Sequence, residues 1–325
     1  MDEFRNPGRA LARAVTVALC VSIGFVSCGK DGSPLPTSPG PVTPDRPAPP
    51  PAPPPAPGGG GGSPATLVGA GDVAMCGAHL QGAEATARLL DGIPGTVFTA
   101  GDNTQTSGTA DEFDGCFGPT WGRHKSRIRP SPGNHDYGTP GAGPYFDYFG
   151  ANAGPAGLGY YSYDLGAWHI VSLNSNVSTS AGSPQVAWLR ADLEASRGRA
   201  CTAAYWHHPL VSSGTNGGSA HVRELWNVLY DYGVEIVMNG HDHMYERYAP
   251  QDPWGRPDPA KGIRQFVVGT GGIYLYGVER PQPNTEAQAS VHGVLKLTLR
   301  PDGYDWEFIS VPGAGFSDRG SAGCH

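Results

Sequence analysis

One stretch organises this chain: Met238-Asn239-Gly240-His241-Asp242-His243-Met244-Tyr245-Glu246-Arg247. It follows an apolar run, residues 234–238, that is typical of a buried strand. Gly240 lets the chain turn sharply at the end of that strand, so His241 and His243 can direct both imidazoles toward one small shared ligand. Neutral imidazole is a good ligand for Zn, Fe and Mn. Surface or core histidines explain an isolated His-x-His pair equally well, so the metal-site hypothesis depends on what the other strands carry.

Four other apolar runs also end in polar side chains that bind metal ions in proteins. Their ends read Gly71-Asp72, Gly101-Asp102-Asn103, Gly133-Asn134-His135-Asp136 and Trp206-His207-His208-Pro209. Each of these alone is compatible with a turn residue, a helix cap or a core histidine. In folds that mix helices and strands, however, ligands collect beyond the carboxyl ends of the strands. Taken together, two carboxylates, one amide oxygen and three imidazoles fit two metal ions that share one carboxylate.

Strands alternate with helices early in the chain and with other strands later. The periodicity predicts helices at 81–90, 185–194 and 221–232. Paired strands at 160–165 and 168–173 flank Gly166, and alternating strands follow at 264–268, 291–299 and 304–311. This order predicts an α/β fold with mixed sheets and with the helices on the outside.

The five motifs resemble, in order, the signature of calcineurin-like metallophosphoesterases, and Gly-His-x-His-x-Tyr-Glu-Arg is similar to the purple acid phosphatase branch of that family. The resemblance covers nearly all of residues 65–325. It implies a four-layer α/β/β/α sandwich with mixed sheets. It also implies two metal sites that share Asp102 as a bridge. The first ion would be held by Asp72, Asp102 and His243, and the second by Asp102, Asn134, His207 and His241.

The resemblance further implies a hydrolase that acts on phosphate monoesters, as an acid phosphatase does. A hydroxide that bridges two metal ions would attack phosphorus, while both ions draw charge from the phosphoryl oxygens. We expect His135 to face the substrate and protonate the leaving group, with Asp136 orienting His135 or raising its pKa. Asn134 and His208 are candidates for binding the phosphate, and His208 is also compatible with simple packing beside Pro209.

Two other functions stay open on the sequence. One is a phosphodiesterase or a nucleotidase that uses the same residues. The other is a surface lipoprotein that keeps the fold and binds a partner without catalysis, although the complete set of six ligands argues against it. We expect residues 138–159 and 212–220 to select the substrate. The aromatic side chains at 145–149 are compatible with stacking on a leaving group and with core packing.

The loop residues after the second histidine are expected to have structural roles. Asp242 should shape the turn, while Tyr245, Glu246 and Arg247 should pair with one another and hold the loop.

The sequence differs from purple acid phosphatases at one ligand position. In that branch a tyrosine three residues after the bridging aspartate binds the first metal, whereas this chain has Gln105 there. A neutral amide cannot supply the phenolate that favours a trivalent ion. We therefore expect a pair of divalent ions, Zn, Mn or Fe(II), and a colourless protein, unless nearby Tyr137 or another group replaces Gln105.

The first 64 residues differ in composition from the rest. Residues 1–28 combine arginines, an apolar run and Ser27-Cys28, which predicts a signal peptide with a possible lipidation site at Cys28; plain secretion is the alternative. Residues 29–64 are rich in Pro and Gly, which predicts a disordered linker, and residues 65–325 are left as one catalytic domain. The net charge of −7 and the lack of a basic run exclude nucleic acid as a structural partner. The sequence gives no prediction for the oligomeric state.

Four cysteines remain outside the leader, and an even number in an exported domain points to disulfides. Cys76 and Cys116 should meet because each follows a metal-bearing strand end. Cys201 opens the strand that leads to His207, and Cys324 would pin the end of the chain beside it. We therefore predict the pairs Cys76–Cys116 and Cys201–Cys324 out of the three pairings that four cysteines allow.

Overall fold

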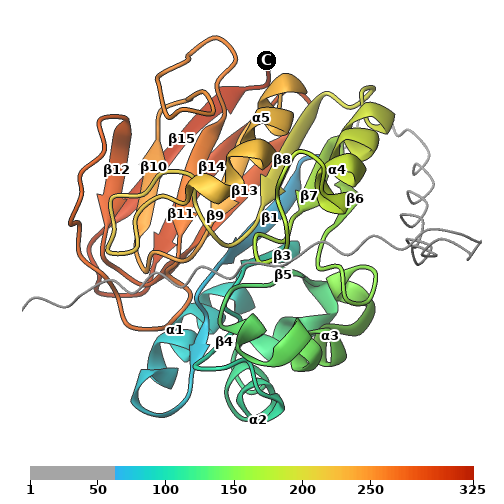
Figure 1. Cartoon of the computed structure of the whole chain (residues 1–325). Helices are drawn as coiled ribbons and strands as arrows, with labels where there is room; N and C mark the ends of the chain where they lie inside the picture. The colour runs from blue at the N-terminus through green and yellow to red at the C-terminus, as the bar shows by residue number, and fades with distance from the viewer. Residues whose placement is uncertain (1–62) are drawn as a thin grey trace, which may run out of the picture. The chain divides into compact units, whose positions relative to one another are not determined.

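The structure is a computed structural model, and it describes residues 63–325. Within this range two mixed β-sheets are stacked, and helices cover their outer surfaces (Figure 1). The strand order is β15-β14-β13-β1-β3-β5 in the six-stranded sheet and β12-β10-β11-β9-β8-β7-β6 in the seven-stranded sheet. The expected α/β sandwich with mixed sheets is confirmed.

The strands are, in chain order, β1 (Ala65–Ala70), β2 (Ala74–Met75), β3 (Thr96–Ala100), β4 (Thr104–Gln105), β5 (Ile128–Ser131), β6 (Tyr161–Leu165), β7 (Trp168–Ser172), β8 (Cys201–Tyr205), β9 (Ile236–Asn239), β10 (Tyr245–Tyr248), β11 (Arg264–Val268), β12 (Thr285–Ala289), β13 (Gly293–Arg300), β14 (Gly303–Ser310) and β15 (Ser317–Gly323). The α-helices are α1 (Leu80–Asp91), α2 (Ala110–Glu112), α3 (Gly143–Phe149), α4 (Pro184–Ala195) and α5 (Arg223–Asp231).

Parallel pairing brings the carboxyl ends of the metal-motif strands to one edge of the sandwich. In the six-stranded sheet β1, β3 and β5 run parallel to one another. In the seven-stranded sheet β7, β8, β9 and β11 are parallel neighbours. Each strand that precedes a predicted metal ligand therefore ends beside the carboxyl ends of its parallel neighbours, and the ligand side chains lie close together there.

Side-chain alternation explains how the seven-stranded sheet separates two cores. On β9, Ile236 and Met238 face the core between the sheets, whereas Val237 faces α4 and α5. The opposite surface of the six-stranded sheet is covered by α1, which packs through Ala83 and Ala87. The order from outside to outside is helix, sheet, sheet, helix.

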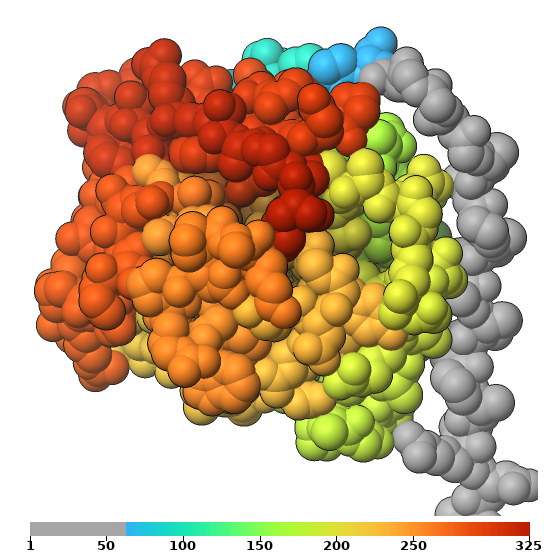
Figure 2. Space-filling model, turned by 90° about the horizontal axis from the view of Figure 1, so that it is seen from above, coloured from blue at the N-terminus to red at the C-terminus, as the bar shows by residue number. Residues whose placement is uncertain are grey.

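Both predicted disulfides are present. Cys76–Cys116 joins the residue after β2 to the π-helical turn Phe113–Phe117 that follows α2, with a Cα–Cα distance of 5.5 Å, and Cys201–Cys324 has a Cα–Cα distance of 5.8 Å. Figure 2 shows the red C-terminal end reaching the yellow segment around residue 200, where the second bond forms. In residues 63–325, no helix has the length and apolar character that crossing a membrane requires.

The prediction for the loop after His243 is wrong. Tyr245–Tyr248 form β10, which pairs with β11 and β12 inside the seven-stranded sheet. Glu246 pairs with neither of its neighbours, while Tyr245 and Arg247 share one partner. Arg247 and the Tyr245 hydroxyl bind Asp318 on β15, and Glu246 accepts hydrogen bonds from Ser213. The charged side chains of this strand are paired with residues from distant segments of the chain. The local sequence does not indicate which residues these partners are.

The predicted leader, the lipidation of Cys28 and nearly all of the predicted linker lie outside the described residues. The aromatic residues at 145–149 belong to the core cluster and its edge. Tyr145 and Phe149 are buried, and their rings contact each other at 5.2 Å between centroids. Core packing is therefore their observed role.

Candidate active site

Left-handed turns place the site residues just beyond the strands. Asp72, Asp102 and His241 all have positive φ, at 59°, 48° and 72°. This conformation is costly for residues other than glycine and is concentrated at functional sites. The turns reverse the chain, so that each side chain faces the space beyond the sheet edges.

Glycine precedes Asp102, Asn134 and His241 because other segments of the same chain approach these positions too closely for a side chain. A Cβ at Gly101 would lie 2.5 Å from Nδ1 of His207, and one at Gly133 or Gly240 would collide with the carboxylate of Asp102 or Asp72. The Gly-Asp, Gly-Asn and Gly-His pairs of the sequence are thus a packing requirement of the site.

Asp72 and His243 form one half of the site. His243 Nδ1 donates a hydrogen bond to the carbonyl of Tyr274 at 2.8 Å, which leaves the lone pair on Nε2 facing Asp72. Nε2 is 3.4 Å from Asp72 Oδ1, an ion-pair distance without hydrogen-bond geometry. Asp72 Oδ1 is buried and lacks a hydrogen-bond partner among the described residues, while Oδ2 accepts from the His241 amide at 2.8 Å. Burying a carboxylate oxygen without a hydrogen-bond donor is unfavourable, and a bound cation would offset that cost.

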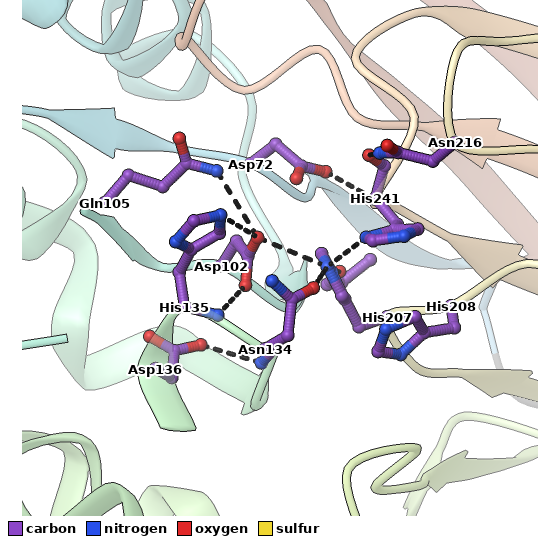
Figure 3. Close-up of polar contacts among 12 residues, drawn as sticks. Asp72, Asp102, Gln105, Asn134, His135, Asp136, His207, His208, Asn216 and His241 are labelled. Carbon is purple, nitrogen blue, oxygen red and sulfur yellow. Dashed lines mark hydrogen bonds and ion pairs between the residues drawn. The ribbon is translucent and has the colours of Figure 1, made fainter. Parts of the chain in front are cut away.

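The second half of the site converges on one nitrogen. His207 Nε2 lies 3.2 Å from Asp102 Oδ2, 3.0 Å from Asn134 Oδ1 and 3.1 Å from His241 Nδ1 (Figure 3). Nδ1 of His207 is 2.9 Å from the carbonyl of Ala100, which fixes the ring so that Nε2 faces inward. Four lone-pair donors that point at one another are the arrangement expected of ligands around a positive charge. The residues Asp72, Asp102 and His207 also lie close enough together to share an ion.

The charges of the cluster are strongly coupled. Burial opposes ionisation of Asp102, but the positive charge of His207 outweighs burial and holds the pKa of that carboxyl well below its usual range. Burial likewise opposes protonation of His207, yet the charge of Asp102 raises the pKa of His207 to about 9. Burial and then the charge of His207 lower the pKa of His241 to about 4 and that of His208 to about 2. His207 Nε2 would have to be unprotonated to hold a cation, so a metal ion at this position would compete with a proton.

His135 reaches the site from the loop after β5. Its Nδ1 lies 2.7 Å from the carbonyl of Thr106, and its Nε2 lies 3.9 Å from Asp102 Oδ2. The ring is one-third exposed, so Nε2 is open to a molecule that enters the site.

Asp136 does not orient that ring as expected. Its Oδ2 accepts from the Gly133 amide at 2.8 Å and from the backbone and side-chain nitrogens of Asn103. Burial, with the negative charge of Asp102, raises the pKa of Asp136 to about 7. The carbonyl of Thr106 orients His135 instead, and Asp136 ties the loop after β5 to the loop after β3.

His208 lies beside the ligand histidines. Its ring centroid is 4.4 Å from that of His241, and Nδ1 lies 2.8 Å from Ser175 Oγ. The atoms of His207, His208 and His241 are also close enough to share an ion. The position next to His241 is compatible with the predicted contact to phosphate.

Tyr274 and Tyr276 contact His243, and Asn216 contacts His241; no motif indicated these three residues, although Asn216 lies in the stretch expected to border the substrate. The side-chain Nδ2 of Asn216 donates to the carbonyl of His241 at 2.7 Å, and the backbone N–H of Asn216 donates to Asp242 Oδ1 at 2.8 Å. Asp242 therefore holds the 214–217 loop as well as its own turn. The small residues at 212–220 gave no sequence signal beyond the expectation that this stretch borders the substrate.

The model of one family, calcineurin-like phosphoesterase, matches residues 67–245, which is more than half of the chain. Purple acid phosphatase 15 of Arabidopsis thaliana is 28% identical over 200 residues, and the match covers 49% of this chain and 37% of that protein. An uncharacterized protein of Mycobacterium tuberculosis is 31% identical over 235 residues, which covers 58% of this chain and 44% of that protein.

Among solved structures, the purple acid phosphatase PPD1 of yellow lupin superposes with a TM-score of 0.69 at 18% identity. The superposition covers 81% of this chain and 54% of the lupin chain, and it shows a shared fold. The chain spans less than half the length of the curated relatives that it matches.

Proposed function

Since the chain belongs to the calcineurin-like phosphoesterase family, we propose that it is a metal-dependent phosphatase that hydrolyses phosphate monoesters. The observation that carries the proposal is the convergence of six ligand side chains from five strand ends. These are Asp72, Asp102, Asn134, His207, His241 and His243. Asp72 Oδ1 has no hydrogen-bond partner among the described residues, and the imidazole nitrogens face one another. Both features fit bound cations better than a network of hydrogen bonds.

Two ions are proposed to divide these residues between them. Asp72, Asp102 and His243 would hold one, and Asp102, Asn134, His207 and His241 the other. When bound, a pair of ions activates water as a nucleophile and withdraws charge from the phosphoryl oxygens. We propose that both ions are divalent, Zn, Mn or Fe(II), because two carboxylates and neutral ligands supply little negative charge for a trivalent ion.

His135 is proposed to donate the proton that the leaving oxygen needs. Its Nδ1 is committed to Thr106, so the exposed Nε2 is the atom that exchanges the proton. His208 is proposed to contact the phosphate, because its ring lies 4.4 Å from that of His241 at the edge of the cluster.

A phosphodiesterase or nucleotidase built on the same residues is the alternative activity. Comparison of nitrophenyl phosphate with bis(nitrophenyl) phosphate separates the monoester from the diester function, since both release the same coloured product. We expect the monoester to be hydrolysed with the higher kcat/KM, and the opposite ranking would replace the monoesterase proposal.

The test of the enzyme proposal combines metal analysis with turnover. Protein purified without chelator should contain two metal ions per chain and should release nitrophenol from nitrophenyl phosphate. His241→Ala should lose activity together with metal. A correctly folded protein that holds metal but hydrolyses neither ester would favour the non-catalytic surface protein.

We also propose that the protein is exported. The two disulfides support this, because such bonds persist in oxidising compartments. Anchoring through a lipid on Cys28 extends the same proposal. Cys28→Ser should release the protein from the membrane fraction, and unchanged membrane association of that variant would reject the anchor.

A further inference from the structure

The segment between β11 and β12, residues 269–284, forms a wall of the site. The Gly271 amide donates to the carbonyl of Gly71 at 2.9 Å, and the Tyr276 amide donates to the carbonyl of His243 at 2.9 Å. These bonds tie the segment to two of the strand ends that carry ligands. The segment passes so closely that a Cβ at Gly271 would lie 2.5 Å from the Gly71 oxygen. The wall is therefore held at a fixed distance from the site.

Two tyrosines of this wall surround His243 in different ways. The Tyr276 ring lies parallel to the imidazole, with 4.0 Å between centroids and 9° between planes. The Tyr274 ring meets the same imidazole edge-on, at 5.0 Å and 67°. His243 is 3% exposed, whereas Tyr274 is 41% exposed. Tyr276 thus covers His243, and Tyr274, whose ring also contacts those of His79 at 5.7 Å and Tyr276 at 5.6 Å, stays partly exposed beside it.

Exposure of a large aromatic ring is uncommon in the described part of the chain. The large hydrophobic side chains that are exposed in residues 63–325 are Trp254, Tyr274 and Val278. Two of these, Tyr274 and Val278, belong to the same wall. Trp254 lies on the loop after β10, which leaves the opposite end of the strands because β10 runs antiparallel to β11. Exposed apolar surface at the rim of a site, unlike a scattered exposed residue, indicates a binding role.

We infer that Tyr274 is the surface on which the organic part of the substrate stacks, so that the site favours phosphate esters whose leaving group carries a flat ring. The inference rests on the proposed phosphoesterase function. Aromatic rings pair at centroid distances of about 4.5–7 Å. Because Tyr274 lies 5.0 Å from a ligand of the proposed metal centre, a ring joined to the phosphate through one oxygen is within its reach. Aryl esters and nucleotides share this flat ring.

The test compares substrates with and without a ring in matched variants. Wild type, Tyr274→Leu and Tyr274→Phe are assayed on phenyl phosphate, adenosine monophosphate and glycerol 2-phosphate. Tyr274→Leu should lower kcat/KM for ring-bearing esters about 10-fold, as expected for the loss of one stacked ring, and leave glycerol phosphate unchanged. Tyr274→Phe should retain the wild-type values. The ratio of variant to wild-type kcat/KM, taken separately for each substrate, cancels the different intrinsic reactivities of the substrates.

Trp254→Leu is the control, since it removes an exposed aromatic ring outside the site and should leave all three values unchanged. A loss confined to phenyl phosphate or to the nucleotide supports the inference and identifies the source of the ring. An equal loss on all three esters, or no loss on any, overturns it while the phosphatase proposal stands.

Inactivity of the wild type on every ester would instead refute the proposed function. The stacking inference is then tested by binding. Calorimetry measures the affinity of the metal-loaded protein for phenylphosphonate, which carries a ring, and for methylphosphonate, which does not. Tyr274→Leu should weaken phenylphosphonate binding about 10-fold and leave methylphosphonate unchanged, and equal changes for both would overturn the inference.

Discussion

In His135, one backbone carbonyl determines which ring nitrogen is available to exchange a proton. Because Nδ1 is bound to the carbonyl of Thr106, Nε2 is the proposed proton donor, and the need for that donor depends on the leaving group. His135→Ala should keep the metal content and lower turnover of glycerol phosphate about 10²–10³-fold, with a much smaller effect on nitrophenyl phosphate, whose leaving group needs no proton. Elemental analysis and initial rates measure both quantities. A fall in metal content that parallels the fall in activity would exclude the acid role.

Gln105 determines the expected colour of the protein. Its Nε2 donates to Asp102 Oδ2 at 3.3 Å, so an amide stands against the carboxylate proposed to bridge the ions. The Tyr137 hydroxyl accepts from Asn174 at 2.9 Å and is therefore occupied outside the site. The purified, oxidised protein should be colourless, and Gln105→Tyr loaded with iron should acquire a visible absorption band. A visible band in the wild-type protein would contradict the divalent assignment.

At the scale of elements, a buried histidine joins two strands to a helix. His169 on β7 lies 3.1 Å from Asp164 on β6 and 2.8 Å from Asp192 on α4, and Arg199 also pairs with Asp164. Burial opposes its protonation, but the two carboxylates outweigh burial and raise the pKa of His169. The folded state therefore binds this proton more tightly than the unfolded chain does. Its stabilising effect is fully present below the unfolded pKa, about 6.5, and is lost as the pH rises through the folded value.

His169→Gln should thus lower the free energy of unfolding by about 1.5–3 kcal/mol at pH 5.5, and by less at pH 9. Urea unfolding of wild type and variant at both pH values measures the difference. Asp192→Asn removes one of the two carboxylates and should reduce the same pH dependence. A loss of stability that is equal at both pH values would show that the ring stays neutral.

The elements that could be predicted from the sequence are those with an apolar period. The ten strands and three long helices named from the sequence bury alternating or 3.6-spaced apolar residues, as β13 and α5 do. The strands that were missed lack this signal for a physical reason. β12 and β15 are edge strands, so their side chains are largely exposed or half-buried. β10 is buried through charged partners on other elements rather than through apolar residues.

At the scale of the whole molecule, the disulfide Cys201–Cys324 connects the end of the described chain to the start of β8. It closes a segment of 123 residues, and such a link stabilises chiefly by restricting the unfolded chain. Replacing both cysteines with serine should lower the free energy of unfolding by about 2–4 kcal/mol, with the metal content unchanged. Urea unfolding with elemental analysis checks this. An unchanged unfolding midpoint would mean that strand pairing alone fixes β15.

The proposed ligand set was accessible to sequence reasoning because five ordered motifs carry it, four of them with a glycine that the packing requires. The aromatic wall was not accessible. Tyr274 and Tyr276 reach His243 only through a loop whose backbone bonds to Gly71 and His243, and no local pattern encodes those contacts.

The position of β1 also determines when the molecule can assemble. β1 lies inside its sheet between β3, which follows soon after it, and β13, which is formed by residues 293–300. During synthesis the nascent chain must therefore hold an apolar strand with one open edge until nearly all of the domain has left the ribosome. We expect a chain terminated before Gly293 to be digested rapidly by protease, whereas the full chain resists. That result would mean that the protein completes folding only after synthesis, and that chaperones which bind exposed strands can engage it throughout synthesis.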